Sequence, residues 1–216
     1  MNARAGHPLE DEAPPTRHVS RGRTFVYVLP CRHEDILKVG YSRDPLERFR
    51  TLHRRFFEFF DLDRGLLIDT ERLREARQVE RLFITTFAEQ RAPAPLVVRQ
   101  AAAGHTEWFR GIAPEAEALA HRLRDEQGYT LHAPLATWLR ARLDERAEAL
   151  FGWSARMLDA LEYEYFNAPA MAGSSRGAAA LRDALDTCAA LGMDLSVLVP
   201  VEVLDWYRSA DYFGSR

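Results

Sequence analysis

A single lysine stands out among the residues that could carry out chemistry. Lys38 is the only lysine in a chain that carries 28 arginines. Lysine supplies a compact cation whose pKa shifts readily, whereas arginine is a permanently charged planar fork. This exception indicates a position where a guanidinium cannot replace the ammonium group, although a rare residue could also fall there by chance. It lies in the string Leu37-Lys38-Val39-Gly40-Tyr41-Ser42, between a short apolar run and a strongly basic segment.

An acidic residue interrupts an apolar helical stripe further along the chain. Leu73, Ala76, Phe83 and Phe87 recur at the spacing of one helical face, and Glu80 falls on that same face. An ionised carboxylate there is costly unless it is paired or bound to a metal ion. Glu80 is therefore a candidate metal ligand, and the alternative is a core-edge glutamate that pairs with a nearby arginine.

A tyrosine and a group of arginines complete the set of candidates. Tyr27 lies in the apolar run 25–29, which is expected to be a strand beside the strand of Lys38. Arg48 lies on a basic helix that should begin at Asp44-Pro45, a capping carboxylate followed by a helix-starting proline. The arginines of the same segment are expected to be solvated or to contact phosphate: Arg43, Arg50, Arg54 and Arg55.

Two regions are needed to position these residues. Strands are expected at 25–29, 36–41 and 65–68, and helices at 45–60, 70–90 and 114–127. The fold class predicted is α+β, with a small mixed or antiparallel three-stranded sheet and flanking helices, followed by an all-α C-terminal domain. Residues 1–20 are expected to be a disordered tail, 21–128 the first domain and 129–216 the helical domain. The helices of that second domain are expected at about 133–150, 154–166, 176–191 and 199–209, with a break at Gly152.

Composition restricts the classes of protein. No apolar run approaches the ~20 residues needed to cross a bilayer, and no signal peptide is recognisable, so a cytoplasmic location without membrane partners is expected. Two cysteines cannot supply a disulfide framework or a zinc site. Residues 17–60 carry ten basic against five acidic residues, whereas residues 113–216 carry ten against sixteen. The basic block could face a polyanion such as nucleic acid, since phosphate contacts dominate such binding.

In their order along the chain, these residues resemble the GIY-YIG nuclease superfamily. Phe25-Val26-Tyr27 stands where that family has Gly-Ile-Tyr, and Lys38-Val39-Gly40 stands where it has Tyr-Ile-Gly. Arg48 falls at the catalytic arginine of the family and Glu80 at its metal-binding glutamate. The resemblance covers about residues 23–125 and implies a three-stranded GIY-YIG-like domain.

The closest branch of that superfamily is the one that reads Lys-Ile-Gly. It includes the phage open-reading-frame DNA-binding domain and the meiotically up-regulated gene type. That branch tends to carry Arg-Asp-Pro-x-x-Arg after the glycine, which is Arg43 to Arg48 here. It commonly ends in Glu-Trp-Phe, which is Glu107-Trp108-Phe109 here.

The resemblance implies a metal-dependent endonuclease, with DNA as the expected substrate. Glu80 would hold one Mg²⁺ or Mn²⁺, because such an ion often uses only one or two protein carboxylates. Tyr27 would orient or deprotonate the attacking water, with Lys38 favouring its phenolate form. Arg48 would stabilise the charge that develops on the phosphate.

Three further residues receive roles from the same resemblance. His53 is a candidate proton donor, and a core-edge histidine is the alternative. Tyr41 and Ser42 would hold the backbone, and Ser42 is also a candidate contact to nucleic acid. Two other functions stay open at this point. One is a DNA-binding module that does not cleave, and the other is an interaction protein that self-associates or binds a partner through residues 130–216.

Overall fold

The computed structural model describes residues 22–98, 107–167 and 175–214. The tail expected over residues 1–20 lies outside them. Within the described residues, no helix is long and apolar enough to cross a membrane.

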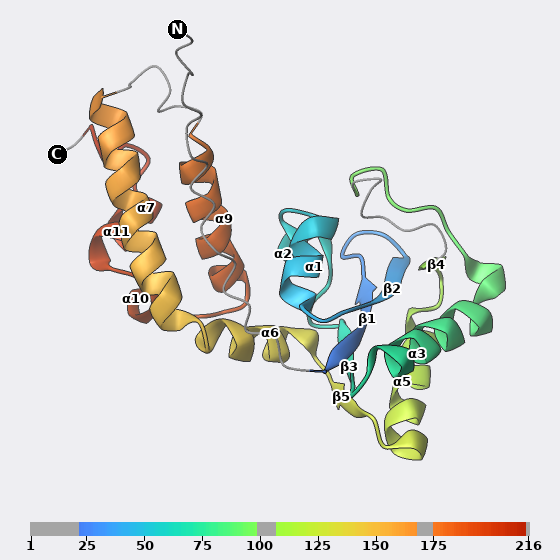
Figure 1. Cartoon of the computed structure of the whole chain (residues 1–216). Coiled ribbons are helices and arrows are strands. Elements are labelled where there is room, and N and C mark those ends of the chain that lie inside the picture. The colour runs from blue at the N-terminus through green and yellow to red at the C-terminus, as the bar shows by residue number, and fades with distance from the viewer. Residues whose placement is uncertain (1–21, 99–106, 168–174, 215–216) are drawn as a thin grey trace, which may run out of the picture.

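The fold is α+β and is built around one antiparallel sheet of five strands (Figure 1). The strands are β1 (Thr24–Pro30), β2 (Ile36–Ser42), β3 (Leu66–Thr70), β4 (Trp108–Arg110) and β5 (Thr130–His132), in the order β4-β2-β1-β3-β5. The three expected strands are confirmed, but the prediction of a three-stranded sheet is wrong. The two edge strands, β4 and β5, have three residues each, which is too short for a recognisable alternation of apolar and polar residues.

Both faces of the sheet are covered, so β1 is buried along its whole length. Successive strand residues point to opposite faces. Phe25 and Tyr27 therefore belong to one apolar cluster, while Val26 and Val28 belong to another. The second face packs against α3 (Leu73–Thr86) and α5 (Ala113–Gln127). The first face packs against α1 (Pro45–Leu52), α2 (Phe56–Phe59) and the C-terminal helices.

The basic helix is shorter than expected. Asp44 caps α1 by accepting the backbone N–H of Glu47 at 3.2 Å, with Pro45 in the first turn. The expected continuous helix 45–60 is wrong, because His53 adopts an extended backbone and ends α1. A second short helix, α2, follows the break and buries both Phe56 and Phe57. The helix expected at 70–90 is α3 followed by a short 3-10 helix, η1 (Ala88–Gln90).

The C-terminal region consists of five helices within the described residues. They are α6 (Leu135–Asp144), α7 (Ala147–Asn167), α9 (Arg176–Ala190), α10 (Leu195–Leu198) and α11 (Val201–Arg208). Figure 1 shows α6 leading from the sheet to the other four. The expectation of a wholly helical region fails at residues 130–132, which form β5. The expected break at Gly152 is also wrong, since α7 continues through this glycine, and a helix tolerates one glycine at a cost of about 1 kcal/mol.

One apolar cluster links the sheet to the C-terminal helices. Phe25 of β1 contacts Trp138 of α6 with ring centroids 5.2 Å apart, and Leu185 of α9 belongs to the same cluster. The division into domains at residue 128 stays a prediction. The shared cluster and the pairing of β5 with β3 both join the two regions in this structure.

Candidate functional site

The centre of the candidate site is a hydrogen bond between a strand tyrosine and a helix arginine. Arg48 Nε on α1 donates to the Tyr27 hydroxyl on β1 at 3.3 Å. Tyr27 is only 1% exposed, and its direct cross-strand partner on β2 is Gly40. A Cβ atom at position 40 would lie 2.4 Å from the Tyr27 hydroxyl oxygen. Gly40 is therefore needed to make room for the tyrosine ring.

We expect Gly40→Ala to displace the Tyr27 ring and to lower the free energy of unfolding by about 1–3 kcal/mol, the usual effect of overpacking a core. Urea denaturation measures this loss. The matched control is Gly152→Ala within α7, where the nearest atom to an added Cβ is the flexible Arg156 side chain at 3.3 Å. The control should be neutral or slightly stabilising. Equal stability of the two variants would show that Gly40 is not needed for space.

Lys38 is buried beside an acidic and an aromatic residue. Its Nζ atom lies 3.5 Å from Glu107 Oε2 and 5.0 Å from the centroid of the Trp108 ring. Glu107 and Trp108 are missing from the predicted site, although β4 pairs Trp108 directly with Lys38. Burial lowers the pKa of Lys38 to about 8, and the attraction of Glu107 opposes that shift. The position thus requires a compact cation, which agrees with the use of lysine here.

Glu80 joins this group from α3. The carboxylate is half-buried, and burial raises its pKa to about 7. The negative charge of Glu107 raises the pKa further, while Lys38, Arg77 and Arg48 lower it. A carboxylate whose ionisation is disfavoured by burial and by the charge of a second carboxylate, with cations beside it, is of the kind that occurs at functional sites.

Burial works against the phenolate that the sequence suggested for Tyr27. It raises the pKa of Tyr27 to about 12, and the positive charge of Arg48 only partly opposes this. Desolvation of the charged form thus outweighs the nearby cation, and Lys38 is not among the largest influences on this pKa. The role of Tyr27 towards water stays a prediction, and its protonated hydroxyl is able to orient another group by a hydrogen bond.

Ser42 and His53 lie apart from this group, and Tyr41 is linked to it through Arg77. Tyr41 lies on the α3 side of the sheet, where its hydroxyl accepts a hydrogen bond from Arg77 Nε at 3.3 Å, and Arg77 in turn lowers the pKa of Glu80. Ser42 donates to the Asp44 carbonyl at 2.8 Å and thereby holds the turn between β2 and α1. His53 stacks on Phe59 at the far end of α1, with ring centroids 4.8 Å apart.

The basic residues around α1 are divided between solvent and the C-terminal helices. Arg43 is exposed in the turn before α1, and Arg50 is exposed on the helix. Arg55 binds Asp183 at 3.0 Å and Asp186 at 2.8 Å, both on α9. Arg54 also pairs with Asp183. Two of the arginines expected to contact nucleic acid are thus paired with the acidic half of the chain.

This ion-pair cluster should contribute to stability. Asp186 accepts hydrogen bonds from Arg55 and from the Tyr207 hydroxyl, at 2.8 and 2.5 Å. We expect Asp186→Asn to lower the free energy of unfolding by about 1–2 kcal/mol, because both donors lose a charged acceptor while the cluster stays partly exposed. Urea denaturation measures the change. Glu117→Gln is the control, since Glu117 is exposed and its contact with His121 is long, at 3.8 Å. A loss no larger than that of the control would contradict the role of the cluster.

A metal ion would have few protein ligands at this site. Within the described ranges, no group of three or more His, Cys, Asp or Glu side chains could hold a metal. Glu80 and Glu107 are the carboxylates of the site, and the negative charge of Glu107 adds to the effect of burial in raising the pKa of Glu80. This donor set fits Mg²⁺ or Mn²⁺, hard ions that keep several waters and use one or two carboxylates.

The carboxylate of the candidate site that the sequence prediction leaves out is Glu107. In the sequence it appears only as the start of the string Glu107-Trp108-Phe109, without an assigned role. A signal was present in the chain, because an acidic residue directly before two aromatic residues places a carboxylate at the beginning of a buried strand. What the sequence could not indicate is that this strand pairs with β2 beside Lys38.

Comparisons with known proteins correct the family. Residues 24–125, just under half of the chain, match the model of the T5orf172 domain. The interpretation as a GIY-YIG nuclease is wrong, because the matching model is that of a different family and no GIY-YIG model matches. The motifs of this chain differ from the GIY-YIG pattern, with Phe25 in place of glycine and Lys38 in place of tyrosine. No curated protein and no solved structure is found to match. Residues 24–125 are thus similar to T5orf172 domains, a group of nuclease-like or DNA-binding domains.

Proposed function

We propose that residues 24–125 bind DNA and hydrolyse a phosphodiester bond with the help of one divalent cation, Mg²⁺ or Mn²⁺. The observation that supports this is the position of Glu80, whose pKa responds to Glu107, Lys38 and Arg48. A site that only binds phosphate has no use for two carboxylates, because they repel the anion. A cation between the carboxylates and the phosphate removes that repulsion.

The side chains suit distinct parts of this reaction. Arg48 would stabilise the negative charge that builds on the phosphate oxygens, as preorganised donors do in transition states. Tyr27 keeps its proton and would orient a phosphate oxygen or a water molecule through its hydroxyl. Lys38 Nζ lies 3.5 Å from Glu107 Oε2, so Lys38 would position this carboxylate and add positive charge to the site. Glu80 and Glu107 would hold the cation, which when bound supplies charge neutralisation and makes a coordinated water more acidic.

The test is cleavage of supercoiled plasmid and of single-stranded DNA by the full chain. Nicking is expected with Mg²⁺ or Mn²⁺ and should disappear when EDTA is added. A preparation that binds DNA but leaves both substrates intact with either metal would contradict the hydrolysis, while keeping the binding.

A DNA-binding module without cleavage is the second candidate. It is favoured by the state of Tyr27, whose buried hydroxyl stays protonated with a pKa of about 12. Such a module should bind DNA without metal, with an affinity that falls steeply as salt rises. Binding measured by fluorescence anisotropy over a salt series, alongside the cleavage assay, separates the two candidates.

An interaction role for residues 130–216 is the third candidate. Tyr163 and Phe166 on α7 are 69% and 62% exposed, which is unusual for large aromatic side chains. Self-association through this helix should appear as a concentration-dependent mass in light scattering. A constant monomer mass that Tyr163→Ser leaves unchanged would count against it.

A further inference from the structure

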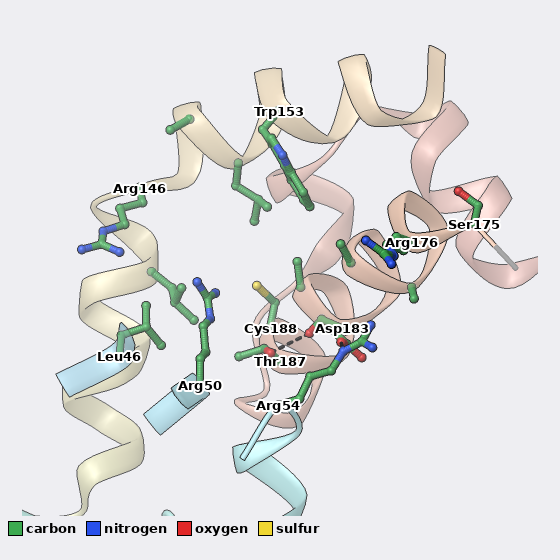
Figure 2. A pocket seen from close by; sticks show the side chains of 16 residues that line it. Leu46, Arg50, Arg54, Arg146, Trp153, Ser175, Arg176, Asp183, Thr187 and Cys188 are labelled. Atoms are coloured by element: carbon green, nitrogen blue, oxygen red, sulfur yellow. Dashed lines mark hydrogen bonds and ion pairs between the residues drawn. The ribbon is translucent and has the colours of Figure 1, made fainter. Parts of the chain in front are cut away.

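A large cavity lies between α1 and the C-terminal helices, away from the candidate site. Its volume is about 830 Å³, within the range typical of pockets for small ligands. The inner wall is mostly apolar and includes Leu46 of α1, Leu143 of α6, Trp153 of α7 and Cys188 of α9. Figure 2 shows Trp153 and Arg50 reaching into the space from different elements.

The rim of this cavity carries an excess of positive charge. Four arginines line it against one acidic residue, Asp183: Arg50, Arg54, Arg146 and Arg176. Asp183 is already paired with Arg54 and Arg55. The excess is notable because the chain as a whole has a net charge of −3 and two of these arginines come from its acidic half.

Two of the rim arginines have no acidic partner among the described residues. Neither Arg50 nor Arg176 forms an ion pair there, whereas Arg146 lies 3.6 Å from Asp44. The charge of Arg50 also reaches the inner wall, where it partly opposes the effect of burial on the pKa of the Cys188 thiol. Arg50 and Arg176 are therefore the positions where an anionic group would form the most favourable electrostatic interaction.

The polar groups of the inner wall are already used by the protein. The Thr187 hydroxyl donates to the Asp183 carbonyl at 2.6 Å, and the Ser175 hydroxyl donates to Glu164 at 2.7 Å. A nucleotide base would need donors and acceptors along its edge. An apolar body needs none, so the wall suits an aliphatic or simple aromatic group better than a base.

The helix α1 also separates this cavity from Tyr27. Residues two apart on a helix point about 200° away from each other, so Arg48 and Arg50 lie on opposite sides of α1. A DNA strand held by Arg48 would not continue directly into the cavity. The cavity is thus a separate site and does not depend on the function proposed above.

We propose that this cavity binds a small amphipathic anion, with its head group on Arg50 and Arg176 and its apolar body against Leu143 and Trp153. The head group is a carboxylate or a phosphate monoester, both of which accept charge-assisted hydrogen bonds from arginine. The body is an aliphatic chain or a simple aromatic ring system.

The test is isothermal titration of the full chain with three probes: sodium dodecanoate, dodecyl phosphate and dodecan-1-ol, all below their aggregation concentrations. Saturable binding of at least one anion is expected at one molecule per chain, and the stronger anion identifies the head group. Arg50→Gln and Arg176→Gln should each weaken that binding about tenfold, and the double variant about 100-fold. Dodecan-1-ol should bind at least tenfold more weakly and should be unaffected by the double variant.

Two further variants make the result specific. Arg122→Gln, an exposed arginine on α5 across the sheet, is the matched control and should bind as the wild type does. Ala184→Phe adds a ring at the cavity wall and should abolish binding, with folding checked by circular dichroism. The proposal is overturned if neither anion binds saturably, if the double variant binds as the control does, or if a short single-stranded oligonucleotide displaces the bound anion.

Discussion

Arg48→Lys is expected to lower the rate of DNA cleavage by at least about 100-fold, a typical effect of removing one donor to a transition-state charge. Arg48 donates a hydrogen bond to the buried Tyr27 hydroxyl, and its positive charge lowers the pKa of both Glu80 and Lys38. Lysine keeps the charge but lacks the planar fork that can bind tyrosine and phosphate at once. The loss should therefore appear in the rate at saturating DNA, with binding changed little.

The matched control for this variant is Arg50→Lys on the same helix. Arg50 is exposed and lines the separate cavity, so its replacement by lysine should leave cleavage unchanged. Single-turnover cleavage of a labelled substrate measures the rate, and circular dichroism confirms folding. If Arg48→Lys cleaves as fast as Arg50→Lys, Arg48 has no special role in the reaction.

Stability is expected to depend on pH through Lys38. The pKa of Lys38 is about 8 in the folded chain, against an ordinary value of 10.5 that applies when the chain unfolds. Between these values the unfolded state binds the proton more strongly than the folded state does. The free energy of unfolding therefore rises as the pH increases from about 8 to 10.5. Below pH 8 the buried lysine is charged, and the free energy of unfolding is lowered by the full cost of burying that charge.

The size of this effect is measurable by comparison with Lys38→Met, which has no charge to bury. The difference between the two pKa values corresponds to about 3 kcal/mol. We expect the wild type to gain about that much relative to Lys38→Met between pH 8 and 10.5, apart from a change at lower pH that arises because Lys38 also lowers the pKa of Glu80. Urea denaturation in EDTA at several pH values between 7 and 10.5 measures it.

A second variant isolates the titration itself. Lys38→Arg keeps a permanent charge over the whole range, so its stability relative to Lys38→Met should not change with pH. Parallel pH curves for the wild type and Lys38→Met would mean that Lys38 is not buried as a charged group.

The parts of the site that the sequence predicted are those defined by local patterns. Alternation and apolar runs were enough for β1, β2 and β3, and helical spacing was enough to place Glu80 on a partly buried face. The rarity of lysine correctly indicated a constrained position, because Lys38 is 1% exposed. These signals concern single elements and their immediate neighbours.

The parts that the sequence did not predict depend on contacts between distant segments. Glu107 reaches Lys38 only because a three-residue strand pairs with β2 after a separation of 69 residues. The raised pKa of Tyr27 follows from burial by elements that lie on both sides of β1. The pairing of Arg55 with α9 spans 128 residues and redirects a side chain that the basic segment alone assigned to nucleic acid.

The family assignment failed for a related reason. Short strings such as Lys38-Val39-Gly40 describe a strand with a glycine in its interior, and here the glycine makes room for the Tyr27 hydroxyl. This requirement is one of packing, so it does not by itself identify a nuclease family. The match to the T5orf172 domain rests on residues 24–125 as a whole.

The proposal that a metal-assisted site cleaves DNA depends most directly on Glu80. The measurement is nicking of supercoiled plasmid with Mn²⁺ or Mg²⁺ by the wild type, by Glu80→Gln and by the exposed control Glu89→Gln, with DNA affinity measured in parallel. We predict nicking by the wild type and the control, a loss of at least about 100-fold in Glu80→Gln, and DNA binding by all three. Equal nicking by Glu80→Gln and Glu89→Gln, or binding without nicking by all three proteins, would contradict a catalytic metal site at Glu80.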